Sequence, residues 1–134
     1  MAKTIGLVLG VVFLAVGLLG MLVANPLVGP GALFETNTLH DLVHLATGLL
    51  FVLVALFAES SMAMFMKIFG VVYLLVAVLG FLSGGMILGL IAANTADHLL
   101  HVVLGVVILG LGWKLGQGNG MGGMSSGMGG GMTA

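Results

Sequence analysis

The chain has 134 residues, of which 60% are hydrophobic and 5% are charged, and its mean hydropathy is +1.34. This composition excludes a soluble globular domain and places the chain in a lipid bilayer. A net charge of −1 offers no basic surface to nucleic acid, and the lack of cysteine excludes disulfides, thiolate metal sites and thiol catalysis.

Four apolar windows are each long enough to cross a hydrocarbon core of about 30 Å as a helix. In chain order they are Ile5–Ala24, Thr38–Ala58, Met62–Leu82 and Thr95–Lys114. The first is longer than the apolar part of a signal peptide, so we expect a retained helix. It also carries a stripe of small residues, which predicts close helix contacts within the bundle. The stripe consists of Gly6, Gly10, Gly17 and Gly20.

The third window repeats the first, because GVVFLAVGLLGML at 10–22 matches GVVYLLVAVLGFL at 70–82. The second and fourth windows open on related motifs, so the repeat covers both members of a pair. We therefore predict an all-α integral membrane four-helix bundle built from two tandem, parallel-oriented helical hairpins, at about 5–58 and 62–115. Residues 1–115 form the four-span transmembrane domain, and 116–134 form a Gly/Met-rich C-terminal tail.

In this arrangement Lys3, Lys67 and Lys114 all fall near one face of the membrane. The positive-inside rule then predicts that both termini are cytoplasmic, in a bacterial plasma membrane or a thylakoid-type membrane. The outer connections at 26–36 and 83–93 carry a single charge, Glu35, so we expect them in the membrane interface or against a neighbouring subunit. A helical turn is expected over Met86–Ala92.

The second and fourth windows begin with NTLHDLVHLATG at 37–48 and NTADHLLHVVLG at 94–105. Asn37 and Asn94 are expected to cap their helices by accepting backbone N–H groups of the first turn. The Asp and His that follow are spaced by three or four residues, which predicts one polar stripe on each helix. The stripe residues are His40, Asp41, His44, Asp97, His98 and His101.

The first interpretation of these stripes is a cluster that clamps the two hairpins together. If the stripes face each other, Asp97 can reach His44 and Asp41 can reach His101. Such pairs would neutralise groups that cost several kcal/mol in lipid, and polar residues commonly join membrane helices.

Two cofactor hypotheses compete with the clamp. His44 and His101 are candidate axial ligands of a haem or chlorophyll-type tetrapyrrole. Gly48 and Gly105, one turn below, would leave room for a macrocycle, although the same glycines equally allow close helix packing that would exclude one. Alternatively, neutral imidazoles with one or both Asp form a ligand set suited to a divalent zinc, iron or copper ion.

Catalysis has little support, because the chain has no Arg, no phosphate-binding loop after a strand and no Ser-His-Asp set. We therefore expect a non-catalytic protein that acts without a cofactor as an accessory or self-associating structural subunit of a membrane complex. Its partners are then the lipid bilayer and other membrane-protein subunits, or itself, and not nucleic acid.

The tail carries Met121, Met124, Met128 and Met132 in a glycine background. Such a segment cannot bury a core, so we expect a flexible low-complexity tail. Thioethers at this spacing are also candidate ligands of a soft metal such as Cu(I).

The order GVVYLLVAVLG, outer turn, Asn-x-x-Asp-x-x-x-His-x-x-x-Gly resembles small four-span bacterial membrane proteins catalogued as a domain of unknown function, the domain of unknown function 4383 family. The likeness covers about residues 5–114 and includes His44, Gly48, His101 and Gly105 together with both capping Asn and Asp97. His40 and the Met-Gly tail depart from the family pattern. The resemblance implies the four-span fold and assigns no activity.

Overall fold

The computed structural model describes residues 1–121 and is all-α apart from four very short strands. The helices are α1 (Ala2–Leu22), α2 (Thr38–Phe57), α3 (Met62–Ser83) and α4 (Thr95–Met121). A 3-10 turn, η1 (Glu59–Ser61), joins α2 to α3. The predicted four-helix bundle is confirmed, and each helix covers one of the four apolar windows.

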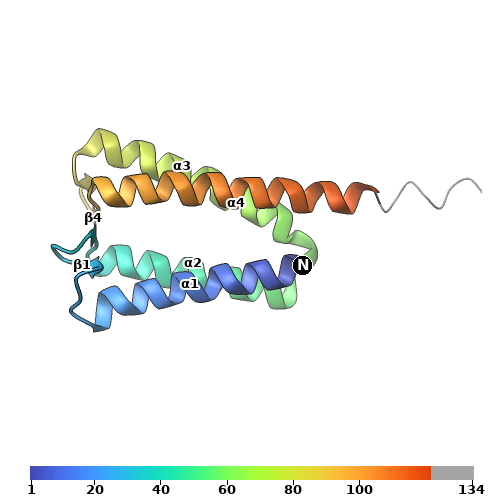
Figure 1. Cartoon of the computed structure of the whole chain (residues 1–134), viewed down its shortest axis with the longest axis horizontal. Helices are drawn as coiled ribbons and strands as arrows, with labels where there is room; N and C mark the ends of the chain where they lie inside the picture. The colour runs from blue at the N-terminus through green and yellow to red at the C-terminus, as the bar shows by residue number, and fades with distance from the viewer. Residues whose placement is uncertain (122–134) are drawn as a thin grey trace, which may run out of the picture.

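The helices pack mainly in two pairs, α1 with α2 and α3 with α4 (Figure 1). Within each pair the helices are antiparallel, and the backbones of the two pairs approach each other less closely than those within a pair. Both loops that carry strands lie at one end of the bundle, which we call the strand end. The N-terminus and η1 lie at the opposite end, which we call the N-terminal end.

Glycines bring the paired helices into backbone contact. A Cβ placed on Gly48 of α2 would lie 2.7 Å from the Gly10 carbonyl oxygen of α1. In the second pair, a Cβ on Gly105 of α4 would lie 3.1 Å from the carbonyl oxygen of Gly70 on α3. A Cβ on any of the four glycines of the predicted α1 stripe would also lie within 3.1 Å of an atom of α2, so the prediction that this stripe serves contacts within the bundle is confirmed.

The strand-end loops are extended and contain no helical turn among the described residues. Strands β1 (Val28–Gly29) and β2 (Phe34–Glu35) pair in parallel, whereas β3 (Met86–Ile87) and β4 (Ile91–Ala92) pair antiparallel. The helical turn expected over 86–92 is wrong, because the chain reverses there through left-handed residues, Leu88 at φ 53° and Gly89 at φ 72°. A β-hairpin of this kind needs positive φ, which glycine supplies.

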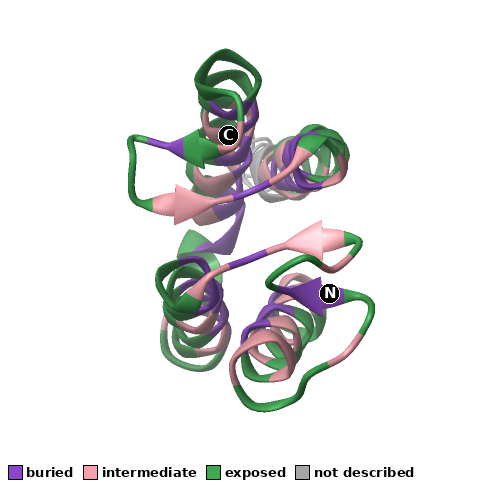
Figure 2. Ribbon diagram, turned by 90° about the vertical axis from the view of Figure 1, so that its left-hand side faces the viewer, coloured by how far each residue is buried: buried purple, intermediate pink, exposed green. Residues whose placement is uncertain are grey.

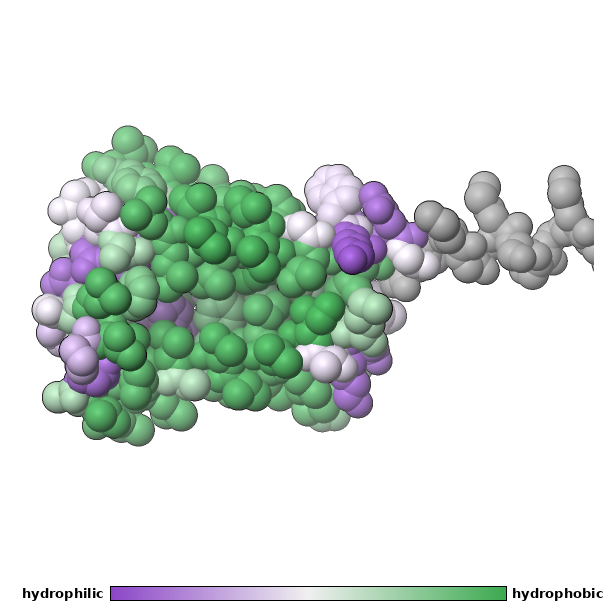
Figure 3. Space-filling view, viewed as in Figure 1, coloured by the Kyte–Doolittle hydropathy of each residue, from purple (hydrophilic) through white to green (hydrophobic). Residues whose placement is uncertain are grey.

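The helices present an apolar belt to the outside. All four are long and apolar enough to cross a membrane. In Figure 3 a hydrophobic band covers the middle of the bundle, and hydrophilic residues gather at both ends. Most of the large apolar side chains of the helices are exposed on this band, as expected for surfaces that face lipid. The protein is thus an integral membrane protein.

An aromatic core fills the space between the two helix pairs. Phe13 of α1 and Tyr73 of α3 occupy corresponding positions of the repeat, and their ring centroids lie 5.4 Å apart. Phe51 of α2 is fully buried, and its ring centroid lies 5.8 Å from that of Phe13. Phe13 and Tyr73 also contact imidazoles, with centroid distances of 6.1 Å to His44 and 5.2 Å to His101. The aromatic core therefore packs directly against His44 and His101.

Candidate metal centre at the strand end

Both motif asparagines cap their own helices. The Asn37 side-chain oxygen accepts the His40 N–H at 3.0 Å, and the Asn94 side-chain oxygen accepts the Asp97 N–H at 3.1 Å. Each bond satisfies a backbone donor that has no partner within the helix. These caps fix where α2 and α4 begin, and hence where their imidazoles lie.

The amide nitrogens of the same two residues reach the opposite repeat. Nδ2 of Asn37 donates to the carbonyl of Leu90 at 2.9 Å, and Nδ2 of Asn94 donates to the carbonyl of Leu33 at 2.9 Å. Leu33 and Leu90 each precede their own Asn by four residues, so the exchange is reciprocal. Viewed from the strand end, the segments that lead into α2 and α4 lie next to each other between the two helix pairs (Figure 2).

The reversed order of His and Asp in the two motifs has a structural reason. His40 and Asp97 both follow their Asn by three residues. His40 Nδ1 donates to the carbonyl of Ala92 at 2.7 Å, whereas Asp97 Oδ2 accepts the backbone N–H of Glu35 at 2.8 Å. Ala92 and Glu35 also correspond in the repeat. One repeat thus uses a side-chain donor and the other a side-chain acceptor to hold the opposite loop.

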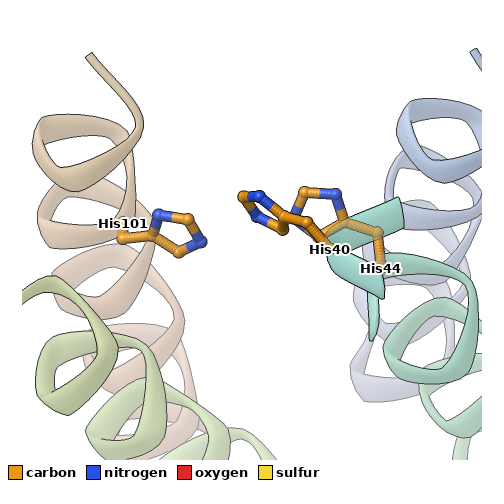
Figure 4. Close-up of side chains that lie close together, drawn as sticks. All are labelled: His40, His44 and His101. Carbon is orange, nitrogen blue, oxygen red and sulfur yellow. The ribbon is translucent and has the colours of Figure 1, made fainter. Parts of the chain in front are cut away.

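Three imidazoles converge at the strand end, between the two helix pairs (Figure 4). His40 and His44 come from α2 and His101 from α4, and one ring nitrogen of each lies within 4.8 Å of the others. Their exposed fractions are 3%, 8% and 6%. The centroid of the His40 ring is 4.6 Å from that of His44 and 5.7 Å from that of His101. The cluster joins helices that belong to different pairs.

Hydrogen bonds orient two of the three rings. His101 Nδ1 is 2.7 Å from the carbonyl of Asp97, and His40 Nδ1 is 2.7 Å from that of Ala92. A carbonyl only accepts, so Nδ1 carries the hydrogen in both rings and Nε2 of each neutral ring holds a free lone pair. The buried Nδ1 of His44 has no hydrogen-bond partner among the described residues. Histidines that bind metal ions typically donate the N–H of their other ring nitrogen to a carbonyl in this way.

The remaining two stripe residues face their own hairpins. Asp41 places its carboxylate against Gly20 of α1, and His98 places its ring against Gly80 of α3. Gly20 and Gly80 occupy corresponding positions of the repeat. The expectation of a single polar stripe on each helix is therefore wrong, since each motif divides its polar residues between two helix faces.

The two carboxylate–imidazole pairs expected from the sequence do not form among the described residues. Asp97 accepts the backbone N–H groups of Glu35 and Asn94, with the latter at 2.9 Å. Oδ1 of Asp41 is buried without a hydrogen-bond partner. Asp97 does not pair with His44, because loop backbone engages its carboxylate. Asp41 does not pair with His101, because its carboxylate lies on the face of α2 that packs against Gly20 of α1.

The tetrapyrrole hypothesis from sequence used only His44 and His101, whereas the metal hypothesis drew on all the imidazoles and Asp of the two motifs, His40 among them. The signal for His40 was its spacing of four from His44, which puts both on one helix face. Of the tail methionines, Met121 is the last residue of α4. Met124, Met128 and Met132 lie outside the described residues.

A family model for the domain of unknown function DUF4383 matches residues 3–114. The chain belongs to the DUF4383 family. The match spans all four membrane helices of this DUF4383 protein, including both histidine motifs. No match is found among curated proteins or among solved structures. Membership in DUF4383 thus agrees with the four-span fold.

Proposed function

We propose that the protein is a non-catalytic integral membrane protein in which His40, His44 and His101 hold one divalent transition-metal ion. The observation that carries the proposal is the convergence of three buried imidazoles within 4.8 Å. Neutral imidazole is a common ligand of zinc, copper and iron. Because the ligands come from both helix pairs, the bound ion would join the two hairpins.

An ion explains this cluster better than side-chain pairing alone. Side-chain pairing leaves the buried Nδ1 of His44 without a hydrogen-bond partner among the described residues, and a buried polar atom without a partner costs free energy. The carboxyl group of Asp97 is engaged by the backbone N–H groups of Glu35 and Asn94. A metal ion would accept one nitrogen lone pair from each of the three imidazoles. The hydrogen bonds from Nδ1 of His40 and His101 to backbone carbonyls already fix the orientation of two of these rings.

The packing also favours a single ion over a tetrapyrrole. The helix faces at Gly48 and Gly105 are covered by α1 and α3, because a Cβ on either glycine would lie within 2.8 Å of an atom of the paired helix. A macrocycle would need those faces open. The rings of His44 and His101 are 6.3 Å apart between centroids, and His40 lies beside both.

A structural role agrees with the surroundings of the site. Three ligands leave one position on a tetrahedral ion, and the low exposure of the imidazoles restricts that position to water or a similarly small group. The pockets around Asp41 and His98 are not lined by these imidazoles. We include in the proposal that the protein serves as an accessory or self-associating subunit in the membrane.

The test is metal binding by the purified full-length protein. After chelator treatment, Co²⁺ and Zn²⁺ are titrated, and Co²⁺ binding is followed by its visible absorption. We expect one ion per chain in the wild type and a loss of binding of at least about tenfold in His40→Ala, His44→Ala and His101→Ala.

His98→Ala is the matched control, since His98 is equally buried but lies outside the cluster. It should bind the ion like the wild type. A wild type that binds no ion, or single variants that bind as tightly as the wild type, would overturn the proposal. A Soret or chlorophyll absorption band that disappears in His44→Ala would instead support a tetrapyrrole.

A further inference from the structure

The first hairpin has an open pocket at the strand end that the metal centre does not use. Its volume is about 500 Å³, and its wall combines the last turn of α1, the first loop and the first turn of α2. Asp41 forms part of the wall, on the face of α2 that packs against Gly20. This volume is in the range of sites for small organic ligands.

Asp41 is the unusual residue of this pocket. Its side chain is 2% exposed, and Oδ1 is buried without a hydrogen-bond partner among the described residues. A buried carboxylate without a partner is costly by several kcal/mol, so it calls for a proton or a positively charged group. The described residues that line the pocket include no Lys or His to provide that charge.

The rest of the wall favours a donor of hydrogen bonds that carries positive charge. Gly20, Met21 and Leu22 belong to the last turn of α1, where backbone carbonyls lack partners within the helix and carry the negative end of its dipole. No aromatic residue lines the pocket. Quaternary ammonium groups are usually bound by aromatic side chains, so this wall favours an ammonium that has N–H groups.

We propose that the Asp41 pocket binds a primary ammonium group. The carboxylate would accept one N–H, and the end carbonyls of α1 would be available to the others. The pocket lies at the strand end, where the hydrophobic band gives way to hydrophilic residues (Figure 3). At that depth the ammonium has two possible sources, the head group of an aminophospholipid and a soluble amine.

The second hairpin offers a natural comparison. Its corresponding pocket, of about 300 Å³, is lined by His98 against Gly80, and Nδ1 of His98 has no partner in the described part of the chain. An imidazole takes the place of the buried carboxylate here, and the acidic residue of this wall, Glu35, is only partly buried. The two hairpins therefore carry chemically different pockets, and only the Asp41 pocket offers a fully buried carboxylate to a cation.

The test uses full-length protein in nanodiscs and in detergent. Native mass spectrometry measures retention of phosphatidylethanolamine against phosphatidylcholine, and thermal unfolding measures protection by ethanolamine against choline. We expect the primary amines to bind and the quaternary ones not to. Asp41→Asn should weaken binding about tenfold, the loss expected for one charge-assisted hydrogen bond. Retention of the lipid without protection by ethanolamine identifies the lipid as the source, and both effects together identify the ammonium group itself.

His98→Gln is the control and should retain wild-type binding. A second measurement needs no variant: hydrogen–deuterium exchange of the backbone amides at 23–30, a segment that lines the pocket, should be slowed several-fold in the wild type by ethanolamine or by phosphatidylethanolamine, and not by choline or phosphatidylcholine. The proposal is overturned if Asp41→Asn binds as well as the wild type, if choline or phosphatidylcholine binds equally, if Na⁺ or Ca²⁺ gives the same protection, or if neither ethanolamine nor phosphatidylethanolamine slows the exchange. None of these results depends on the metal centre, which is tested by its own histidine variants.

Discussion

At the scale of single residues, Asn37 performs two tasks that substitution can separate. Ser keeps an oxygen for the helix cap and loses the Nδ2 bond to the Leu90 carbonyl, whereas Ala loses both. We expect Asn37→Ser to lower the free energy of unfolding by about 1 kcal/mol and Asn37→Ala by about 2 kcal/mol. Equilibrium unfolding in mixed detergent measures both. Thr38→Ala at the exposed neighbouring position is the control, because Thr38 makes neither bond. An Asn37→Ser protein as stable as the wild type would contradict the assigned bond to Leu90.

Thr36 allows a second test at this scale. Its side chain is 1% exposed, and its hydroxyl has no hydrogen-bond partner among the described residues. Replacing an unsatisfied buried hydroxyl by a methyl group removes a desolvation cost, so Thr36→Val should leave stability unchanged or raise it by about 1 kcal/mol. The same unfolding measurement applies. A clear loss of stability would mean that the hydroxyl has a partner, such as a bound water.

The residue scale also shows what sequence could and could not predict. The caps of Asn37 and Asn94 follow from local chemistry, since an Asn before a helix accepts N–H groups of its own first turn. The partners of His40 and Asp97 did not follow, because each bonds to a loop of the other repeat. Backbone groups carry no residue identity, so nothing in the sequence marks the Ala92 carbonyl or the Glu35 N–H as a partner.

At the scale of helices, close packing makes Gly48 intolerant of a side chain. An added Cβ would lie 2.7 Å from both the Gly10 carbonyl oxygen and the Leu14 nitrogen, which are backbone atoms and cannot move aside cheaply. We expect Gly48→Ala to destabilise the protein by about 1–3 kcal/mol through overpacking. Gly110→Ala is the control, because nothing lies within 4 Å of its added Cβ, and the better helix propensity of Ala should stabilise it slightly. Thermal unfolding in detergent ranks the two variants, and equal stability would contradict the packing of α1 on α2.

Helices were easier to predict than the loops for a physical reason. A membrane helix needs a long apolar run, and the four runs are unmistakable in this sequence. The strands β3 and β4 have only two residues each, and their hairpin depends on the backbone conformation of Leu88 and Gly89. Apolar residues such as Ile87 and Ile91 occur equally well in a helical turn, so composition alone did not separate the two structures.

At the scale of the whole molecule, the two hairpins contact each other through side chains of two kinds. Some are identical in the two repeats, and others differ between them. The reciprocal bonds of Asn37 and Asn94 retain the symmetry of the repeat. The exchange of His for Asp at positions 40 and 97 breaks it, and puts a third imidazole beside His44 and His101. Two identical copies with Asp at that position would hold the loops through acceptors alone and leave only two imidazoles. The asymmetry is therefore what the proposed three-histidine centre requires.

The orientation of the whole molecule in the membrane stays a prediction, and the chain is well suited to test it because it has no cysteine. Lys114 lines a pocket with Met1 and Glu59 at the N-terminal end, where the backbone N–H of Lys3 also bonds to Glu59, at 3.0 Å. Lys67 lies over the ring of Trp113, next to Lys114 in sequence, at 4.9 Å. All three lysines thus belong to one end, and the positive-inside rule predicts that this end is cytoplasmic.

Single cysteines report this orientation directly. Leu33→Cys and Leu90→Cys lie in the two strand-end loops, where the native side chains are 55% and 61% exposed, and Ser60→Cys lies in η1 at the opposite end. In intact cells we expect a membrane-impermeant maleimide to label the two loop cysteines and to reach Ser60→Cys only after permeabilisation. The reverse pattern would place the lysines outside. Labelling of Leu33→Cys and Leu90→Cys from opposite sides would mean that the hairpins are inverted, and the three imidazoles could then not share one ion.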